Sequence, residues 1–94
     1  MKVVWFYRAV EDLQAIGEYI ARENPSAAYE MVVRIKKAGD SLADHPQSGR
    51  TGRVKTTREL VVAGTPYLLP YRIKNKEVQI LRIFHAAQKW PDKF

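Results

Sequence analysis

Four cationic side chains lie within the nine residues from Arg50 to Arg58, and two glycines, Gly49 and Gly52, loosen the backbone around them. The cationic residues are Arg50, Arg53, Lys55 and Arg58, and an apolar, β-branched run follows them at once. Each arginine can form two parallel hydrogen bonds to a phosphate or a carboxylate. We therefore expect a flexible basic loop that feeds a β-strand and presents positive charge to a polyanion. The alternative is a solvated loop whose charge only keeps the protein soluble.

The positive charge of the chain is confined to its second half. Residues 1–43 contain six Lys or Arg and six Asp or Glu, whereas residues 44–94 contain ten and four. The formal charge of +6 therefore arises entirely from the second half. Such segregation favours one basic face. The sequence pI of about 9.8 is typical of proteins that bind nucleic acid or strongly acidic proteins.

Length and composition predict one small domain over residues 1–94, with a thin core. The absence of cysteine excludes a disulfide framework and a thiolate metal site. No stretch approaches the roughly 18 consecutive apolar residues of a membrane span, and residues 1–8 are too short for the apolar part of a signal peptide. We expect a soluble, cytoplasmic protein that does not bind membranes. No motif in the chain implies a cofactor or a metal.

Two helices are predicted ahead of the basic loop. Residues 2–7 are rich in β-formers and predict a first strand. Apolar residues spaced three and four apart then predict amphipathic helices over about 9–23 and from Pro25 to about residue 44. Asn24 suits the N-cap and Pro25 the first helical position, so the two helices form an αα-hairpin.

Three strands are predicted behind the basic loop, over residues 58–63, 67–73 and 77–84. Pro70 lies inside the second of them and predicts a bulge or an unpaired N–H, because proline cannot donate to the ladder. The order βααβββ predicts an α+β fold. In it the N-terminal strand, the αα-hairpin and a three-stranded antiparallel meander form one mainly antiparallel sheet.

Sequence blocks along nearly the whole chain keep the order and spacing of one known family. The blocks are Ala9, Asp12-Leu13, Ile16 and Tyr19-Ile20 in the first helix, then Asn24-Pro25, Pro46, Gly49-Arg50, residues 58–62 (RELVV), 67–73 (YLLPYRI) and 80–85 (ILRIFH). Together they resemble the RelE/ParE superfamily of bacterial toxins from type II toxin–antitoxin systems. The resemblance implies a βααβββ toxin that arrests growth and is neutralised by a cognate antitoxin in a hetero-oligomer.

The resemblance also implies one of two targets. RelE-like members cleave mRNA on the ribosome, whereas ParE-like members poison DNA gyrase and are not nucleases. Metal-free RNA cleavage needs a base, an acid and cations around the developing charge. His85 can serve as the acid or base. The candidate cations are Lys55, Arg58, Arg72 and Arg82, and the aromatic residues that can stack on a base are Tyr67 and Trp90.

Three positions depart from the nuclease pattern. RelE-like nucleases carry an arginine where this chain has Leu68, and a basic or aromatic residue beyond the last strand, where it has Ala86 and Ala87. ParE-like members share these losses, so the pattern favours gyrase poisoning over mRNA cleavage. The side chains expected to bind the target or nucleic acid are Arg50, Arg53, Lys55, Arg58, Arg72 and Trp90.

Several of these residues also have a purely structural interpretation. His85 can be a strand-end histidine bonded to the backbone. Arg72 and Arg82, expected on adjacent strands, can line a basic face or be held by acidic groups. Trp90 can pack the C-terminal tail onto the sheet or contact a target. Two further functions stay open: a nucleic-acid-binding module without toxicity, and a degenerate toxin that only binds its antitoxin.

Overall fold

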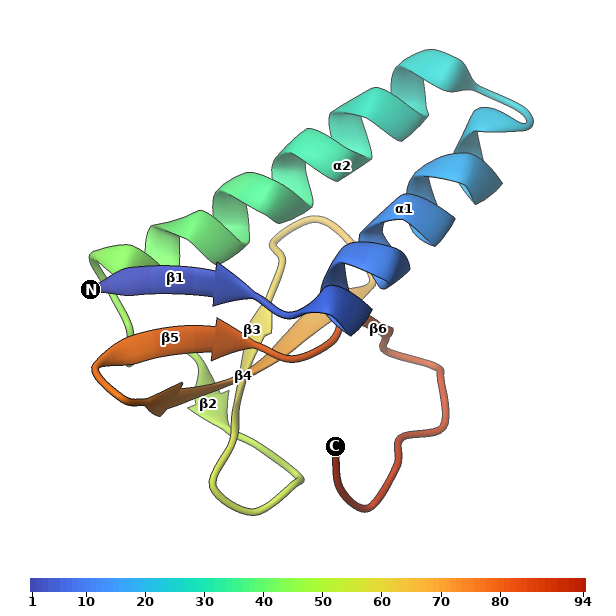
Figure 1. Cartoon of the computed structure of the whole chain (residues 1–94). Coiled ribbons are helices and arrows are strands. Elements are labelled where there is room, and N and C mark those ends of the chain that lie inside the picture. The colour runs from blue at the N-terminus through green and yellow to red at the C-terminus, as the bar shows by residue number, and fades with distance from the viewer.

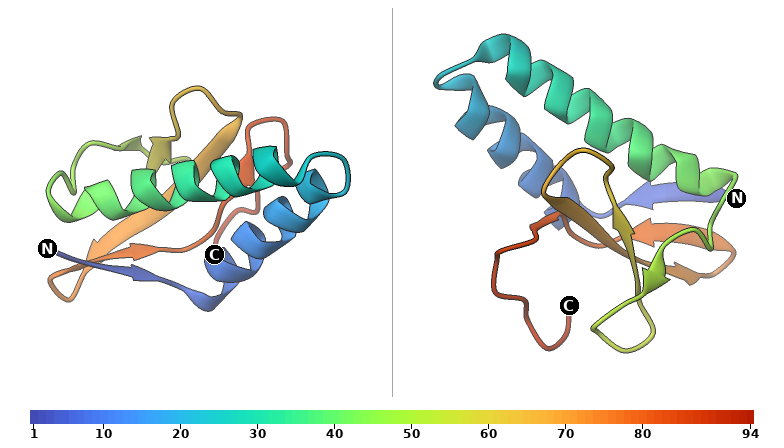
Figure 2. Two further views of the ribbon diagram at one scale, coloured as in Figure 1. Left: turned by 90° about the horizontal axis from the view of Figure 1, so that it is seen from above. Right: turned by 180° about the vertical axis from the view of Figure 1, so that it is seen from behind.

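A helical hairpin lies across one face of a six-stranded sheet in the computed structural model, which describes residues 1–94 (Figure 1). The two further views show the helices on one side of the strands and the C-terminal tail beyond the other (Figure 2). In chain order the elements are β1 (Lys2–Trp5), α1 (Tyr7–Ala21), α2 (Pro25–Asp40), the 3₁₀ helix η1 (Ser41–Ala43), β2 (Arg50–Thr51), β3 (Arg58–Val61), β4 (Tyr67–Lys74), β5 (Glu77–Ile80) and β6 (Phe84–His85).

The sheet is mainly antiparallel, as the sequence predicts. Its order is β1-β5-β4-β3-β2, and β6 pairs with β4 beyond the end of β5. The meander β3-β4-β5 is antiparallel throughout, and only β1 runs parallel to its neighbour β5. The α+β fold with the βααβββ order is therefore confirmed. The short strand β2 is an addition that the periodicity did not predict, and β6 begins at the last residue of the strand predicted over residues 77–84.

The αα-hairpin forms as expected, with shifted ends. The Asn24 side chain accepts a hydrogen bond from the Ala27 N–H at 3.1 Å, and Pro25 opens α2. The second helix ends at Asp40 rather than near residue 44, because the chain tightens into η1 before Pro46. The first helix begins at Tyr7, two residues earlier than predicted, so the first strand is correspondingly shorter.

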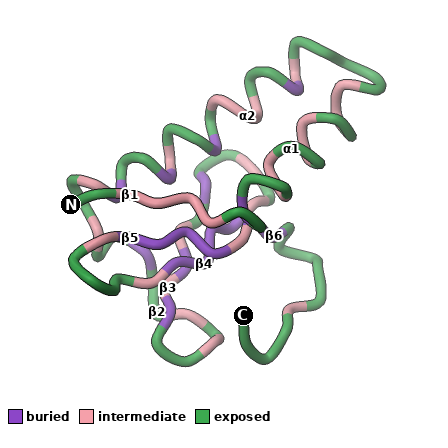
Figure 3. Tube along the Cα trace, viewed as in Figure 1, coloured by how far each residue is buried: buried purple, intermediate pink, exposed green.

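The core lies between the helices and the sheet and is thin, since 19 of the 94 residues are buried (Figure 3). Ile35 and Leu42 from the helical layer are fully buried, and they meet Leu69, Tyr71 and Ile80 from the sheet. The opposite face of the sheet has no helical layer. We call it the open face; Val4, Gln79, Arg72, Pro70 and Glu59 lie on it, offset by one residue from the core positions.

The last predicted strand is interrupted, which corrects the expectation of one strand over residues 77–84. Leu81 donates its N–H to the Pro70 carbonyl at 2.9 Å, but Pro70 has no N–H to return to the Leu81 carbonyl. The pairing then resumes one residue out of register, from Tyr71↔Ile80 to Leu68↔Phe84. The bulge expected at Pro70 is therefore present, but in the strand opposite it.

Neither helix is long and apolar enough to cross a membrane.

Gly39 marks the tightest contact between the helices and the sheet and provides the first test of the fold. A Cβ atom there would lie 2.6 Å from Trp5 Cη2 and 2.8 Å from Ile80 Cδ1. The indole cannot withdraw freely, because its N–H donates to Asp40 Oδ1 at 3.0 Å. We expect Gly39→Ala to lower the free energy of unfolding by about 1–3 kcal/mol through overpacking. Urea denaturation followed by circular dichroism measures this.

Gly17→Ala is the matched control, since a Cβ there meets only Val32 Cγ2 at 3.1 Å. Alanine gains up to about 1 kcal/mol of helix propensity over glycine, so this variant should stay within about 1 kcal/mol of the native protein. Equal stability of the two variants would contradict the packing described here.

Candidate functional site

The basic loop is organised around one buried carboxylate. The Glu59 side chain is 1% exposed and lies on the open face of β3, directly opposite Arg50 of β2. Its Oε1 is 3.2 Å from Arg50 Nη2, and its Oε2 accepts the Arg53 backbone N–H at 2.7 Å. The Arg53 Nε lies 3.7 Å from the same oxygen. The loop expected to be flexible is thus fastened to the sheet, because a buried charge must be paired.

Arg58 is fastened on the other face of the sheet. It pairs with Tyr71 across the β3–β4 ladder, and Tyr71 belongs to the core between sheet and helices. The Arg58 Nη1 donates to the Gly49 carbonyl at 2.8 Å, and its Nη2 donates to Gln47 Oε1 at 3.1 Å. Arg58 therefore does not share a face with Arg72.

Tyr71 holds the start of the same loop. Its hydroxyl donates to the Pro46 carbonyl at 2.8 Å and accepts the Gly49 N–H at 2.9 Å. Burial raises the pKa of the Tyr71 hydroxyl above its ordinary value, so the group serves here as a neutral donor and acceptor.

Lys55 is the one candidate cation of the loop that has no partner. It is exposed at the tip, next to Thr56, whose φ is +68°. The turn beneath it is closed by hydrogen bonds from the Gly52 N–H to the Thr57 carbonyl at 2.9 Å and from Thr57 Oγ1 to the Val54 carbonyl at 2.6 Å. The backbone therefore presents the Lys55 ammonium group to solvent.

The basic loop and the C-terminal tail, residues 86–94, lie side by side beyond the open face (Figure 1). The Arg53 guanidinium lies over the Trp90 ring, 3.9 Å from its centroid, in a cation–π contact. The Trp90 ring in turn packs edge-on against Phe84, with centroids 4.9 Å apart. Trp90 thus packs the tail onto the sheet and links it to the loop.

Arg82 is held by a carboxylate from the helical layer. It lies in the interruption between β5 and β6, not on a strand as expected, and its Nε and Nη2 donate to Asp12 at 2.7 and 3.0 Å. Asp12 Oδ2 also accepts the Ile83 N–H at 2.9 Å, which the register shift leaves without a ladder partner. Hydrogen bonding to Asp12 raises the pKa of Arg82 above its ordinary value.

Arg72 keeps most of its binding capacity. Its Nε donates to Gln79 Oε1 at 2.6 Å, and Gln79 donates to Glu77 at 2.9 Å, but Arg72 itself forms no ion pair. Its guanidinium carbon lies 5.7 Å from the Phe6 ring centroid. Arg72 and Arg82 are therefore not equivalent, although both are near the open face.

His85 ends β6 and is fixed by its own backbone neighbourhood. Its Nδ1 accepts the Ala87 N–H at 3.1 Å, and its ring meets the Tyr67 ring edge-on at 5.7 Å. With Nδ1 occupied as an acceptor, the neutral ring carries its proton on Nε2. His85 consequently offers an N–H donor, not a free basic nitrogen. No three His, Asp or Glu side chains are grouped so that they could hold a metal ion.

The two carboxylates that fix the arginines, Glu59 and Asp12, were not among the predicted site residues. Glu59 alternates with Arg58 along a strand, so the sequence carried a signal that they lie on opposite faces. Asp12 lies 70 residues from Arg82 and gave no local signal of that pairing.

The chain is similar to known proteins over nearly its whole length. A family model described as the ParE toxin of the type II toxin–antitoxin system parDE matches residues 3–90. Y4kP of Sinorhizobium fredii, described as a candidate toxin, is 50% identical over 90 residues, which cover 96% of this chain and 93% of that protein. Toxin RelE2 of Caulobacter vibrioides is 47% identical over 87 residues, which cover 93% of this chain and 97% of that protein.

Solved structures with the same fold include toxin–antitoxin systems. A chain of the chromosomal ParDE system from P. aeruginosa superposes with a TM-score of 0.82 and 33% identity, covering 90% of this chain and 95% of that chain. A chain of the RelBE2 toxin–antitoxin complex from Mycobacterium tuberculosis has a TM-score of 0.64 and 24% identity, covering 89% and 95%. At that identity, the second likeness concerns the fold alone.

Glu59→Gln tests whether the buried carboxylate organises the basic loop. The amide keeps the size of the side chain but removes the charge that pairs with Arg50 and Arg53, and we expect a loss of about 1–3 kcal/mol in the free energy of unfolding. Under native conditions, trypsin should cut faster after Arg53 and Lys55 than in the unchanged protein.

Glu77→Gln is the control, because it removes the same charge from the open face at the far end of β5, where Glu77 contacts Gln79. Unchanged cleavage of the loop in Glu59→Gln would show that the carboxylate does not hold it.

Proposed function

The chain belongs to the ParE toxin family and is the toxin of a type II toxin–antitoxin module, and from this premise we propose that its target is DNA gyrase. In this proposal the toxin poisons gyrase by binding it and does not cleave RNA. The compartment is the cytoplasm, where gyrase and the ribosome both act.

One observation supports gyrase over mRNA as the target. The candidate catalytic side chains Arg82 and His85 already form hydrogen bonds to partners within the chain. Arg82 gives two hydrogen bonds to Asp12, so its charge is already neutralised. The His85 Nδ1 accepts a backbone N–H, so the ring lacks the free nitrogen that a general base needs.

The remaining cations do not gather around one phosphate position. Arg58 lies on the helix-facing side of β3 and is bonded to Gly49 and Gln47, whereas Arg72 lies on the open face of β4. Cleavage without a metal needs several donors aimed at the same developing charge. This arrangement supplies exposed positive charge for binding without a focused catalytic centre.

The surface proposed for target binding is the basic loop with the adjoining tail. Lys55 is exposed and unpaired, and the side chains of Arg50 and Arg53 are 57% and 48% exposed although they contact Glu59. Trp90 extends this surface through its stack with Arg53. Cations on a fixed scaffold steer an acidic partner and lose little entropy when they bind it.

A cognate antitoxin is the second partner, since the matching family model is that of a type II toxin–antitoxin toxin and the similar P. aeruginosa chain comes from a ParDE system. The net charge of +6 suits an acidic partner. In this proposal the chain is bound to that antitoxin in a hetero-oligomer while the cells grow, and growth stops when the chain is released from it.

Induction of the chain alone in a bacterial host tests the proposed target. We expect DNA synthesis to stop first, with filamentous cells and intact messages, and purified toxin should inhibit supercoiling by gyrase. His85→Ala should change this inhibition by less than about threefold, whereas loss of a general acid or base costs about 10²–10⁴-fold. An early halt of translation with cut messages, abolished by His85→Ala, would replace gyrase poisoning with mRNA cleavage.

Lys55→Glu tests the proposed target surface. Reversal of an exposed, unpaired charge at the loop tip should weaken gyrase inhibition by about tenfold without changing the melting temperature. Lys37→Glu is the matched control, because Lys37 is also exposed but lies on α2, across the sheet from the open face. Equal inhibition by both variants would exclude the loop tip from the target contact.

A further inference from the structure

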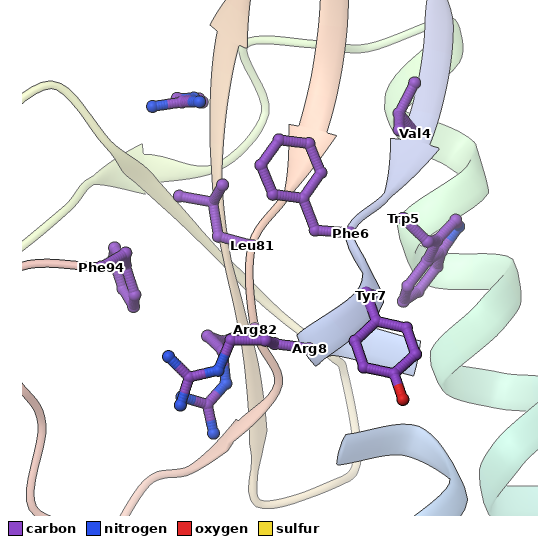
Figure 4. Close-up of a pocket in the computed structure, with 9 residues that line it drawn as sticks. Val4, Trp5, Phe6, Tyr7, Arg8, Leu81, Arg82 and Phe94 are labelled. Atoms are coloured by element: carbon purple, nitrogen blue, oxygen red, sulfur yellow. The ribbon is translucent and has the colours of Figure 1, made fainter. Parts of the chain in front are cut away.

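The structure contains an apolar groove that shares only Phe94 with the proposed target surface. It opens where β1 and β5 end, and its volume is about 480 Å³, within the range of about 300–1,000 Å³ that is usual for ligand pockets. The rings of Phe6 and Phe94 stand on either side of Leu81 (Figure 4). Phe6 and Phe94 are both partly exposed, so the groove is open to solvent.

The groove follows from the sheet topology. Because β1 and β5 are parallel, the chain leaves these two strands at the same end of the sheet. At Phe6 the chain turns away into α1, while at Leu81 it continues along β4 towards β6. Two neighbouring parallel strands from which the chain departs in different directions leave a crevice beyond their carboxyl ends.

The rim of the groove carries positive charge that the chain itself does not neutralise. Three arginines line it, and only Arg82 forms an ion pair. Arg8 is exposed. Arg72 donates its Nε–H to the neutral side chain of Gln79, and both of its terminal nitrogens remain free to bind a carboxylate. The helix α1 begins beside them with no side-chain cap and no acidic residue in its first turn, so the positive end of its dipole adds to the rim.

The C-terminal residue forms one wall of this groove. Phe94 is 41% exposed, and its ring stacks on the buried Phe84 ring at a centroid distance of 5.9 Å. An apolar side chain bound against Leu81 would cover the exposed part of Phe94, so the end of the tail contributes directly to the binding surface.

We propose that this groove binds an acidic segment of a partner protein, with an apolar side chain seated between Phe6, Leu81 and Phe94 and a neighbouring carboxylate paired to Arg72. Charge complementarity selects a carboxylate, and the aliphatic floor selects an apolar side chain beside it. The partner is the antitoxin of the module, and in this identification the inference rests on the proposed function.

The affinity of the full-length chain for its cognate antitoxin tests the groove. Arg72→Gln removes the charge but keeps a polar side chain, and it should weaken the complex about 10- to 100-fold, the usual loss for a charge-assisted pair. Phe94→Ala should weaken it about fivefold, since it removes one apolar wall but no buried core group. Isothermal titration calorimetry measures both.

Lys74→Gln is the matched control, because Lys74 lies on the same strand and the same face as Arg72 but outside the groove. Its affinity should change by less than about threefold, as expected for a rim charge. A charge swap then identifies the contact: Arg72→Glu should lose affinity, and one Glu→Lys or Asp→Lys change in the antitoxin should restore it.

The outcomes separate this inference from the proposed function. Native affinity in both Arg72→Gln and Phe94→Ala would overturn the groove while leaving a working toxin and antitoxin. Loss of gyrase inhibition or of RNA binding in Arg72→Gln, with native antitoxin affinity, would assign the groove to a target and also overturn the inference. Absence of growth arrest and of antitoxin binding in the unchanged chain would instead defeat the proposed function.

Discussion

The groove and the packing of the C-terminal tail both depend on one constraint, the missing N–H of Pro70. Because the Leu81 carbonyl finds no donor opposite it, the last strand cannot continue along β4 in register. The chain takes one extra residue before it pairs again at Phe84. This single step separates β5 from β6, opens the groove beside Leu81 and places Phe84 where the tail can pack on it.

The step is possible because a helix supplies the hydrogen bonds that the sheet loses. Asp12 accepts the Ile83 N–H and two donors of Arg82, so a stretch without ladder partners is fixed across the domain. The same logic operates at the other end of the open face, where Glu59 fastens Arg50 and Arg53. In a domain with a thin core, these two carboxylates hold in place segments that apolar packing would fix in larger proteins.

The elements were predictable because their signals are local. Apolar spacing and the Asn24-Pro25 cap predict the hairpin, and short runs rich in apolar residues, separated by turn residues, predict the meander. The interruption at residues 81–83 was not predicted, because no turn residue breaks the strand-like stretch 77–84 and the cause of the interruption lies in a different strand. Pairings such as that of Asp12 with Arg82 depend on the fold, and no periodic pattern in the sequence indicates them. A count of basic residues therefore overstates the free positive charge, since three of the arginines are already paired.

The groove and the proposed target surface are joined through the Phe84 ring, which residues of both contact. Phe94 forms a wall of the groove and stacks on Phe84, while Trp90, on which Arg53 lies, packs against the same ring. A segment bound in the groove would press on Phe94 and so act on the tail that supports Arg53. Contact with the loop is not required for this effect. Neutralisation of the toxin can therefore follow from occupation of the groove, because the tail joins the two surfaces through packed aromatic rings.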